Sequence, residues 1–354
     1  MREMLVPDPW QGLNHNCVGE MQWLAELPTN TFCSLWRNWF QTEDLPVGHD
    51  LYVISYHLEA IDIDWIIRQC DRIQQPIILL SDAKYYDFQA PKNLYCFTYL
   101  YWHQQIKKMQ RWFPEATDKN IIYKVSAVCH RITQSKLLIH TVLAEIYQDD
   151  ALLILGDWVD GHSAVPEVTG NVLIDHTSSI FWSKYFGRIR RIDGFDNSKN
   201  YQKYTADPWT AIYQQTGLHC TNESFHYSLM ETPGRQFIYP GPFLTEKTFK
   251  CLLGATGFIS VGQFETYRIL QSLGFEFDYG IDLSFDSDPG NLSRMEKIIK
   301  LLLDLKKFSA QELFDLTRTS SLYNQDHILS GRFAEQCEKI NFVTRERIMD
   351  LFGR

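Results

Sequence analysis

Glu246 and Lys247 are adjacent charged residues placed where they could bind the diphosphate of a nucleotide. They follow Thr245, which we expect to cap a short amphipathic helix that ends at Gly254. Free N–H groups and the positive end of the helix dipole favour an anion at such a helix start. Lysine adds a mobile positive charge, and the neighbouring carboxylate can accept hydrogen bonds from both hydroxyls of a ribose. The alternative is an ordinary capped helix whose Glu246 and Lys247 side chains are solvated.

Glu223 is a second carboxylate, and we expect it at the end of a strand close to the same helix start. It precedes Thr245 by about twenty residues, and the predicted helix is followed by a buried strand over 257–262 and a second helix over 264–273. An isolated glutamate after a strand is otherwise an ordinary surface residue. Only its spacing from Glu246 makes Glu223 a candidate for ligand binding.

This order of residues resembles the donor-binding half of the GT-B glycosyltransferases, above all the fucosyltransferase-like and exostosin-like enzymes and a group of phage and virus glycosyltransferases. The likeness runs over about 65 residues, 218–286: Glu223, then Thr245-Glu246-Lys247, a strand and a Leu-Gly-Phe turn. It implies two Rossmann-like domains that face a cleft, with C-terminal helices returning to the first domain. In that family the Glu and Lys of the triplet hold the ribose and phosphates of a nucleotide sugar, and Glu223 would contact the sugar or the nucleotide.

The resemblance also implies that the first βα turn of the donor domain presents a basic residue to the diphosphate. Arg131 or Lys136, on either side of the start of a predicted helix over 134–147, could fill this role. Together with Lys247, such a residue would neutralise the departing nucleotide diphosphate without a metal ion or a cofactor. The alternative is that Arg131 and Lys136 are exposed residues at a helix start.

Asp82 is the candidate for the catalytic base. It follows a predicted strand over 76–81, and in open α/β sheets ligands bind beyond the carboxyl ends of the strands. An inverting glycosyl transfer needs a carboxylate that takes the proton of the acceptor hydroxyl. The segment around Asp82 resembles the strand–Thr/Ser–Asp segment of phage DNA β-glucosyltransferases. An Asp that caps the next turn is the alternative, and Glu59 and His57 are weaker candidates for the base.

The expected donor is a UDP-linked sugar, and the expected acceptor is a hydroxyl group, with 5-hydroxymethylcytosine in phage DNA as the favoured case. A duplex target requires base flipping and a basic rim, for which residues 187–194 with Lys107, Lys108 and Arg111 are the candidates. Cell-surface glycan or protein acceptors fit the same core. A non-catalytic nucleotide-binding module and a structural protein remain alternatives.

The chain of 354 residues is long enough for two domains, predicted as 1–118 and 119–325 with C-terminal helices over 326–354. A net charge of −9 argues against broad non-specific binding to nucleic acid or anionic membrane. Eight cysteines without a Cys-x-x-Cys pair indicate reduced thiols and no zinc site. No apolar run approaches the roughly 20 residues of a membrane span, so we expect a cytoplasmic protein, in the host cytoplasm if viral.

The remaining elements follow an alternating strand and helix pattern, after a tryptophan-rich start (1–50) expected to form helices and loops. A polar loop is expected over 184–210. Ser293/Glu296 and Ser309/Glu312 both have the spacing of a capping box. The other predicted elements are strands over 51–55, 93–100, 121–128, 152–155 and 171–175, and helices over 63–73 and 103–113.

Overall fold

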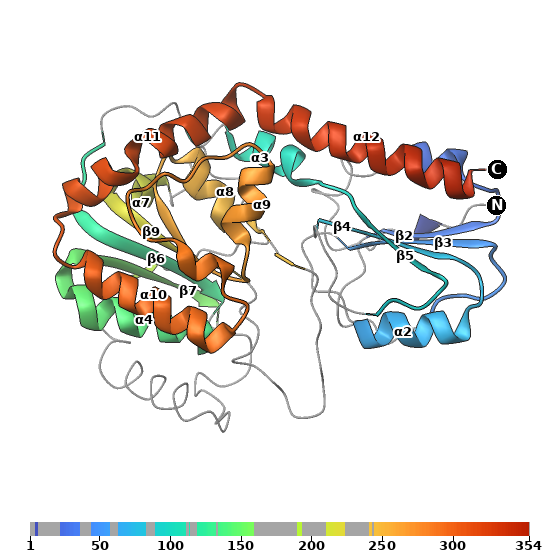
Figure 1. Cartoon of the computed structure of the whole chain (residues 1–354), viewed down its shortest axis with the longest axis horizontal. Helices are drawn as coiled ribbons and strands as arrows, with labels where there is room; N and C mark the ends of the chain where they lie inside the picture. The colour runs from blue at the N-terminus through green and yellow to red at the C-terminus, as the bar shows by residue number, and fades with distance from the viewer. Residues whose placement is uncertain are drawn as a thin grey trace. The chain divides into compact units, whose positions relative to one another are not determined.

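The computed structural model of the chain forms two compact units, each built around a parallel sheet (Figure 1). The first unit comprises the described residues of Met1–Lys107 and Gly331–Arg354, with Gly241 and Pro242, and the second those of Lys108–Glu231 and Leu244–Ser330. The sequence prediction placed the divisions at 118/119 and 325/326. The structure describes residues 4–5, 22–35, 44–56, 63–82, 89–110, 113, 119–131, 134–158, 190–192, 210–223, 241–242 and 244–353.

The sheet of the first unit has five parallel strands in the order β1-β2-β3-β4-β5, which is also their order in the sequence. The tryptophan-rich start therefore contributes two strands, and the prediction of helices and loops alone for residues 1–50 is wrong. Besides these strands, the described part of that region holds the short 3₁₀ helix η2 (Gln22–Glu26). The strands are β1 (Met4–Leu5), β2 (Thr31–Leu35), β3 (Leu51–Tyr56), β4 (Ile77–Ser81) and β5 (Leu94–Thr98).

Among the described helices, α2 and α12 lie on opposite faces of this sheet (Figure 1). Helix α2 (Ile63–Arg72) buries Trp65 and Ile66 against the sheet. On the other face lies the C-terminal helix α12 (Arg332–Phe352), which buries Ile348. Because these two layers enclose both faces, the central strands β3 and β4 are buried almost throughout.

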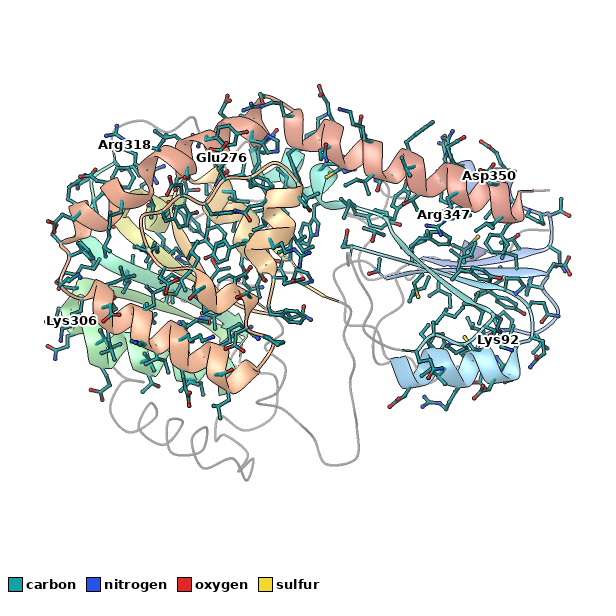
Figure 2. All side chains as sticks on the ribbon, in the orientation of Figure 1. Lys92, Glu276, Lys306, Arg318, Arg347 and Asp350 are labelled. Carbon is teal, nitrogen blue, oxygen red and sulfur yellow. The ribbon has the colours of Figure 1, made fainter. Side chains whose placement is uncertain are left out.

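Polar side chains fix α12 to strand β5. The carboxamide of Asn341 accepts from Leu100 N (2.7 Å) and donates to Leu100 O (2.8 Å), and Thr344 Oγ1 donates to Thr98 O (2.8 Å). Arg347 lies on the same helix (Figure 2). Its guanidinium lies over the Phe97 ring at 5.7 Å from the ring centroid. The last helix of the chain is thus part of the first unit.

The sheet of the second unit has the order β10-β9-β6-β7-β8, again with all neighbours parallel. The chain builds it outward from β6 through β7 to β8 and then returns to the other side of β6 for β9 and β10. This reversal makes the β6/β9 junction a topological switch point, as in doubly wound Rossmann-like sheets. The strands are β6 (Tyr123–Arg131), β7 (Ala151–Trp158), β8 (Arg190–Ile192), β9 (Thr216–Asn222) and β10 (Phe258–Val261).

Helices enclose this sheet on both faces (Figure 1). On one face α4 (Gln134–Tyr147) packs beside α10 (Asn291–Leu305), and Tyr147 OH donates to Leu302 O (2.7 Å). On the other face lie α7 (Thr210–Gln215), α8 (Glu246–Leu253) and α11 (Ala310–Leu329). The other described helices are α3 (Trp102–Gln110), α9 (Thr266–Ser272), and the 3₁₀ turns η3 (Gln148–Asp150) and η6 (Ser284–Ser287).

The predicted α/β class is therefore confirmed as two parallel sheets flanked by helices, compatible with a pair of Rossmann-like domains. The predicted helix over 134–147 and the capping box of Ser309 and Glu312 are also confirmed. The Ser293/Glu296 box is wrong, because α10 begins earlier and Ser293 Oγ instead donates to Asp288 Oδ1 (2.9 Å). Strand β8 lies inside the predicted loop, and the predicted strand over 171–175 lies outside the described residues. None of the described helices has the length and apolar character that crossing a membrane requires.

Candidate functional site

The start of α8 lies beside Glu223, which directly follows strand β9, as predicted. Thr245 is the N-cap, and its Oγ1 accepts from Lys247 N (3.3 Å), while Gly254 is the C-cap. The helix face carrying Phe249, Leu252 and Leu253 is buried. The capping signals in the sequence thus predict both ends of the helix, while its burial extends beyond the predicted apolar side to Thr248, Lys250 and Cys251.

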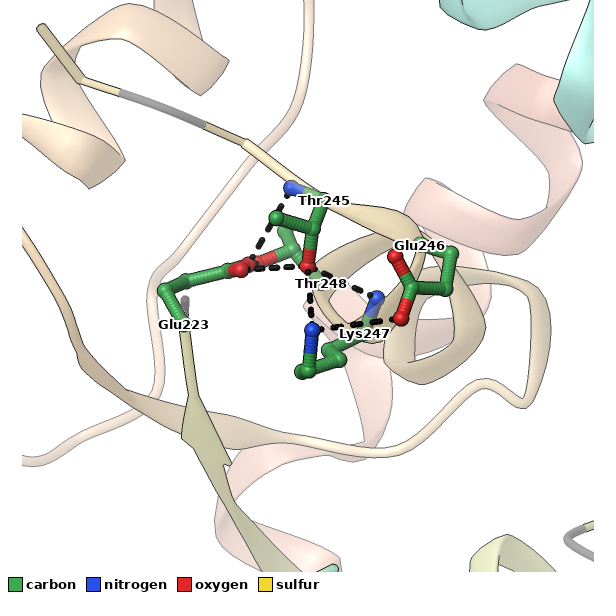
Figure 3. A network of polar contacts seen from close by, with 5 residues as sticks. All are labelled: Glu223, Thr245, Glu246, Lys247 and Thr248. Carbon is green, nitrogen blue, oxygen red and sulfur yellow. Dashed lines mark hydrogen bonds and ion pairs between the residues drawn. The ribbon is translucent and has the colours of Figure 1, made fainter. Parts of the chain in front are cut away.

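Glu223 follows β9 and holds the first turn of α8 (Figure 3). Its Oε1 accepts from Thr245 N (3.4 Å) and from the Thr248 hydroxyl, and its Oε2 accepts from the Thr245 hydroxyl. Only 3% of Glu223 is exposed. Its two oxygens are directed at the helix, so the side chain positions α8, whereas the sequence prediction assigned it to ligand contact.

Lys247 folds back over the helix start and contacts its neighbours (Figure 3). Its Nζ lies 3.1 Å from Glu246 Oε1 and 3.2 Å from Thr245 Oγ1. The side chain of Lys247 is 17% exposed and that of Glu246 36%. The two predicted ligand-binding side chains are therefore partly open to solvent and paired with one another. We call Glu223, Thr245, Glu246, Lys247 and Thr248 the α8-start network.

Burial and neighbouring charges oppose one another in this network. Burial raises the pKa of Glu223, and the nearby Lys247 ammonium and the threonine hydroxyls offset only part of that rise. Burial also acts to raise the pKa of Glu246, but the ammonium groups of Lys247 and Lys250 outweigh it and hold the pKa below its usual range. Burial acts to lower the pKa of Lys247, and the carboxylates of Glu246 and Glu223 outweigh it, so the pKa is raised. Glu246 and Lys247 are thus both charged at neutral pH.

The topological switch point brings Arg131 to the same edge of the sheet as Glu223. In the register of β6 and β9, Ala127 lies opposite Cys220. Arg131 comes four residues after Ala127 and Glu223 three residues after Cys220, so both lie at the carboxyl ends of neighbouring parallel strands. Ligands of doubly wound folds bind in this crevice. The side chain of Arg131 is outside the described ones.

Lys136 lies in the first turn of α4 and is 5% exposed. The alternative of an exposed residue at a helix start is therefore wrong for Lys136. Helix α4 and helix α8 cover opposite faces of the sheet (Figure 1). Helix α8 packs on strand β9, where its Cys251 Sγ lies 3.3 Å from Thr221 Oγ1. The helices that follow β6 and β9 thus diverge to opposite faces, which is the geometry that opens a crevice at a switch point.

Asp82 lies at the carboxyl end of β4 in the first unit, as predicted from its place after a strand. Its Oδ1 accepts from Tyr101 N (3.0 Å), and the residue is 8% exposed. Tyr101 OH lies 2.9 Å from Ser55 Oγ on β3, so these contacts link the ends of three neighbouring strands. The backbone N–H that Asp82 accepts is nineteen residues away and is not in the next turn, which lies outside the described residues, so the capping alternative and the role as a base both stay predictions. Glu59 and His57 lie outside the described residues.

Two contributors were missed in the sequence although their spacing was visible. Thr248 follows Thr245 by three residues and therefore shares its helix face, which brings both hydroxyls to Glu223. Lys250 follows Glu246 by four residues, the spacing at which a Glu and a Lys interact on a helix.

The predicted basic rim is only partly described. Arg190, Arg191 and Ile192 form β8 at an edge of the second sheet, and Lys107 is an exposed residue of α3. The side chains of Lys108 and Arg111 are outside the described ones. Within the described ranges, no group of three or more His, Cys, Asp or Glu side chains is placed to hold a metal ion. No protein-family model and no curated protein matches the sequence of this chain.

Proposed function

We propose that this chain is an inverting, metal-independent GT-B glycosyltransferase that takes a sugar from a nucleotide-diphosphate donor. The observation that carries the proposal is the position of Lys247. Its ammonium lies at the N-terminus of α8, beside the switch point of a Rossmann-like sheet, and is held by Glu246 and Thr245. Backbone N–H groups, helix dipole and lysine charge combine there in favour of an anion.

The donor diphosphate would lie against Lys247 and the first N–H groups of α8. Arg131 and Lys136, which belong to the end of β6 and the start of α4, would add positive charge from the other side of the switch point. These cations would stabilise the negative charge that develops on the diphosphate as the sugar departs.

Asp82 would be the general base. The acceptor hydroxyl oxygen attacks the anomeric carbon and forms a new C–O bond, while the bond from that carbon to the diphosphate oxygen breaks. The hydroxyl proton passes to the Asp82 carboxylate, and the diphosphate leaves with the electron pair. The favoured acceptor is 5-hydroxymethylcytosine in phage DNA, modified in the cytoplasm, and hydroxyls of cell-surface glycan or protein are the alternatives.

A non-catalytic nucleotide-binding module is the second candidate, and one contact favours it. Asp82 Oδ1 accepts from Tyr101 N, so the carboxylate has a structural task that does not need catalysis. Such a module would bind nucleotide sugars without hydrolysing or transferring them.

The test is calorimetric titration of UDP-glucose and GDP-fucose into the wild type and Lys247→Ala. A charge-assisted contact to a desolvated phosphate is worth on the order of 2–3 kcal/mol, so affinity should fall by roughly 30- to 150-fold. Lys297→Ala is the matched control, because Lys297 is 52% exposed and pairs with Asp288 at 2.6 Å in the same unit. An affinity that Lys247→Ala leaves unchanged removes Lys247 from the site.

Transfer itself is tested by mass spectrometry of hydroxymethylcytosine DNA incubated with a panel of nucleotide sugars. A mass increase of one sugar per modified base supports the enzyme. Binding of a nucleotide sugar without transfer to DNA, glycan or protein acceptors supports the module.

A further inference from the structure

The C-terminal helix α12 is buried along one side, and its opposite side carries two apolar residues into solvent. Phe342 and Val343 lie on that outer side and are 57% and 65% exposed. At 3.6 residues per turn, the point midway between them lies opposite the centre of the buried side. The buried side consists of Phe333, Cys337, Asn341, Thr344 and Ile348.

Two opposite charges flank this apolar pair on the same outer side. Lys339 precedes Phe342 by three residues, Glu346 follows Val343 by three residues, and both charged residues are exposed. Lys339 and Glu346 are seven residues apart, which is about two helical turns or roughly 10 Å along the axis, so they share one face of the helix. We call Lys339, Phe342, Val343 and Glu346 the outer face of α12.

The outer face is complementary to a second copy of itself. When two copies pack antiparallel about a two-fold axis, Lys339 of each copy lies beside the partner's Glu346, and Phe342 packs on the partner's Phe342. A parallel pair would instead bring the two lysines together and the two glutamates together, which is unfavourable. The arrangement of charge around the apolar pair therefore fits a second chain in the antiparallel direction.

The other charges near the outer face are compatible with this pairing. Glu346 Oε1 lies 3.5 Å from Arg345 Nη2, and the two side chains are 52% and 40% exposed. An exposed pair of this length is weak, so it does not prevent Glu346 from binding a lysine of another chain. Further out, Glu335 and Asp350 lie on opposite sides of the centre line of the face, so these like charges do not meet directly in the antiparallel pair.

We propose that the outer face of α12 is the interface of an antiparallel homodimer. The inference uses no residue of the proposed nucleotide site and does not depend on it. A single pair of helices, each of 21 residues and about 30 Å long, makes a small interface. We therefore expect a weak, concentration-dependent dimer with a dissociation constant on the order of 10 μM.

The first test is sedimentation equilibrium of the full chain and of Phe342→Asp at about 1–200 μM, a range that spans the expected dissociation constant. Phe342→Asp should weaken dimerisation by at least about 30-fold, because two carboxylates would meet where two rings pack. Leu303→Asp on α10 is the matched control, since Leu303 is 53% exposed in the second unit and should not affect self-association. Circular dichroism and the melting temperature of each variant establish that the fold is intact.

The second test exchanges the charges of the outer face. Lys339→Glu and Glu346→Lys should each weaken self-association by roughly tenfold, because each variant replaces two attractive contacts by two repulsive ones. An equimolar mixture of the two single variants should dimerise within about threefold of the wild-type affinity, since two opposite-charge contacts form again in the heterodimer. The double variant Lys339→Glu/Glu346→Lys should recover in the same way.

Each outcome decides the proposal. Dimerisation that Phe342→Asp removes and the exchanged charges restore supports the antiparallel pair. A wild type that stays monomeric throughout the concentration range overturns it, and so does a dimer that Phe342→Asp leaves intact, because another surface would then join the chains. Weakening by the single charge variants without recovery in their mixture also overturns it. A monomeric chain that binds UDP-glucose would overturn the dimer and leave the proposed function standing.

Discussion

Replacement of Glu223 tests whether its carboxyl group builds the site by positioning α8. Glu223→Ala removes the acceptor of three donors: Thr245 N, the Thr245 hydroxyl and the Thr248 hydroxyl. Glu223→Gln keeps one acceptor oxygen but places an NH₂ group on the other side. The Thr245 hydroxyl already accepts from Lys247 N and Nζ, so it cannot easily accept a third donor.

The expected magnitudes follow from these contacts. A buried polar group left without a partner costs about 1–3 kcal/mol, so three donors give a loss of about 3 kcal/mol or more for Glu223→Ala. The glutamine variant loses one good contact and should be destabilised by about 1 kcal/mol. In a unit of about 200 residues, 1 kcal/mol corresponds to roughly 2–4 °C in the melting temperature. The melting temperature should therefore fall by roughly 6–12 °C for Glu223→Ala and by roughly 2–4 °C for Glu223→Gln.

The difference in the free energy of unfolding between the wild type and Glu223→Gln should also depend on pH. Burial raises the pKa of Glu223 in the folded chain above the 4.5 of an unperturbed glutamate. Below pH 4.5 both states hold the proton, and the stability contribution of Glu223 is fully present. As pH rises from 4.5 through the folded pKa, the unfolded state releases its proton first, so this contribution is lost. The wild type should therefore lose stability relative to Glu223→Gln as pH rises.

Differential scanning calorimetry of the full chain between pH 5 and 8 measures both effects. Subtracting the glutamine variant from the wild type at each pH removes the contributions of all other titrating groups. A difference that grows with pH would refute the argument, because it would mean that folding favours the charged carboxylate. A melting temperature unaffected by Glu223→Ala would show that the three contacts carry no stability.

Three further predictions concern other parts of the chain. Lys119→Met should destabilise the second unit by about 3 kcal/mol in chemical denaturation, with Lys297→Met as a near-neutral control. The Nζ of Lys119 lies 2.6–3.0 Å from four acceptors that its three N–H groups share, and methionine leaves them without this donor (Tyr213 O, Gly254 O, Ala255 O and Thr256 Oγ1). The second unit should lose stability on acidification below pH 6.5. Burial lowers the pKa of His140 to about 4 and that of His219 to about 3, so on acidification the unfolded state takes up protons before the folded state does. The melting temperature should therefore fall as pH falls, and His219→Gln should make this fall less steep. Asp82→Asn should lower turnover by roughly 10²–10⁴ with donor affinity and melting temperature unchanged, because the amide oxygen can still accept from Tyr101 N; retained activity would place the base elsewhere.

The helix ends of the second unit were predictable because their signals are local. Thr245 and Gly254 delimit α8, and Ser309 with Glu312 begins α11 through bonds between residues three apart. Ser293 has the same spacing to Glu296, but Asp288, outside the motif, takes its hydroxyl. The capping signal fails here because α10 begins at Asn291, which places Ser293 inside the first turn instead of at the N-cap.

The strands missed in the first unit lack a local signal. Strand β2 reads Thr-Phe-Cys-Ser-Leu, which does not alternate regularly between polar and apolar residues. In the structure Thr31, Phe32 and Cys33 are all buried, as in strands covered on both faces. Its place in the sheet depends on parallel pairing with β1 and β3, which are distant in the sequence.

Strand β8, which was missed in the second unit, reads Arg-Arg-Ile and lies at the edge of its sheet, where composition is a poor guide to strand formation.

The candidate site could be located from the sequence more readily than its contacts. The spacing of residues in the sequence predicted that Thr245, Glu246 and Lys247 lie at a helix start and that Glu223 follows a strand. Which carboxylate faces the helix and which faces solvent depends on the close approach of β9 to α8, where Thr248 supplies the deciding hydroxyl. Such tertiary contacts have no counterpart in sequence spacing.

The membership of α12 in the first unit has a consequence for synthesis on the ribosome. The first unit cannot be completed until Arg332–Phe352 has emerged, because Asn341 and Thr344 fasten that helix to strand β5. The second unit ends at Ser330 and is fully translated before then. At about 5–20 residues per second, the sheet of β1–β5 waits for over 200 residues of later chain, a delay of tens of seconds at the slower rate. A chain that ends at Ser330 and is released from the ribosome would therefore hold every residue of the second unit, but its N-terminal sheet would lack the helix that supplies Ile348 to its core.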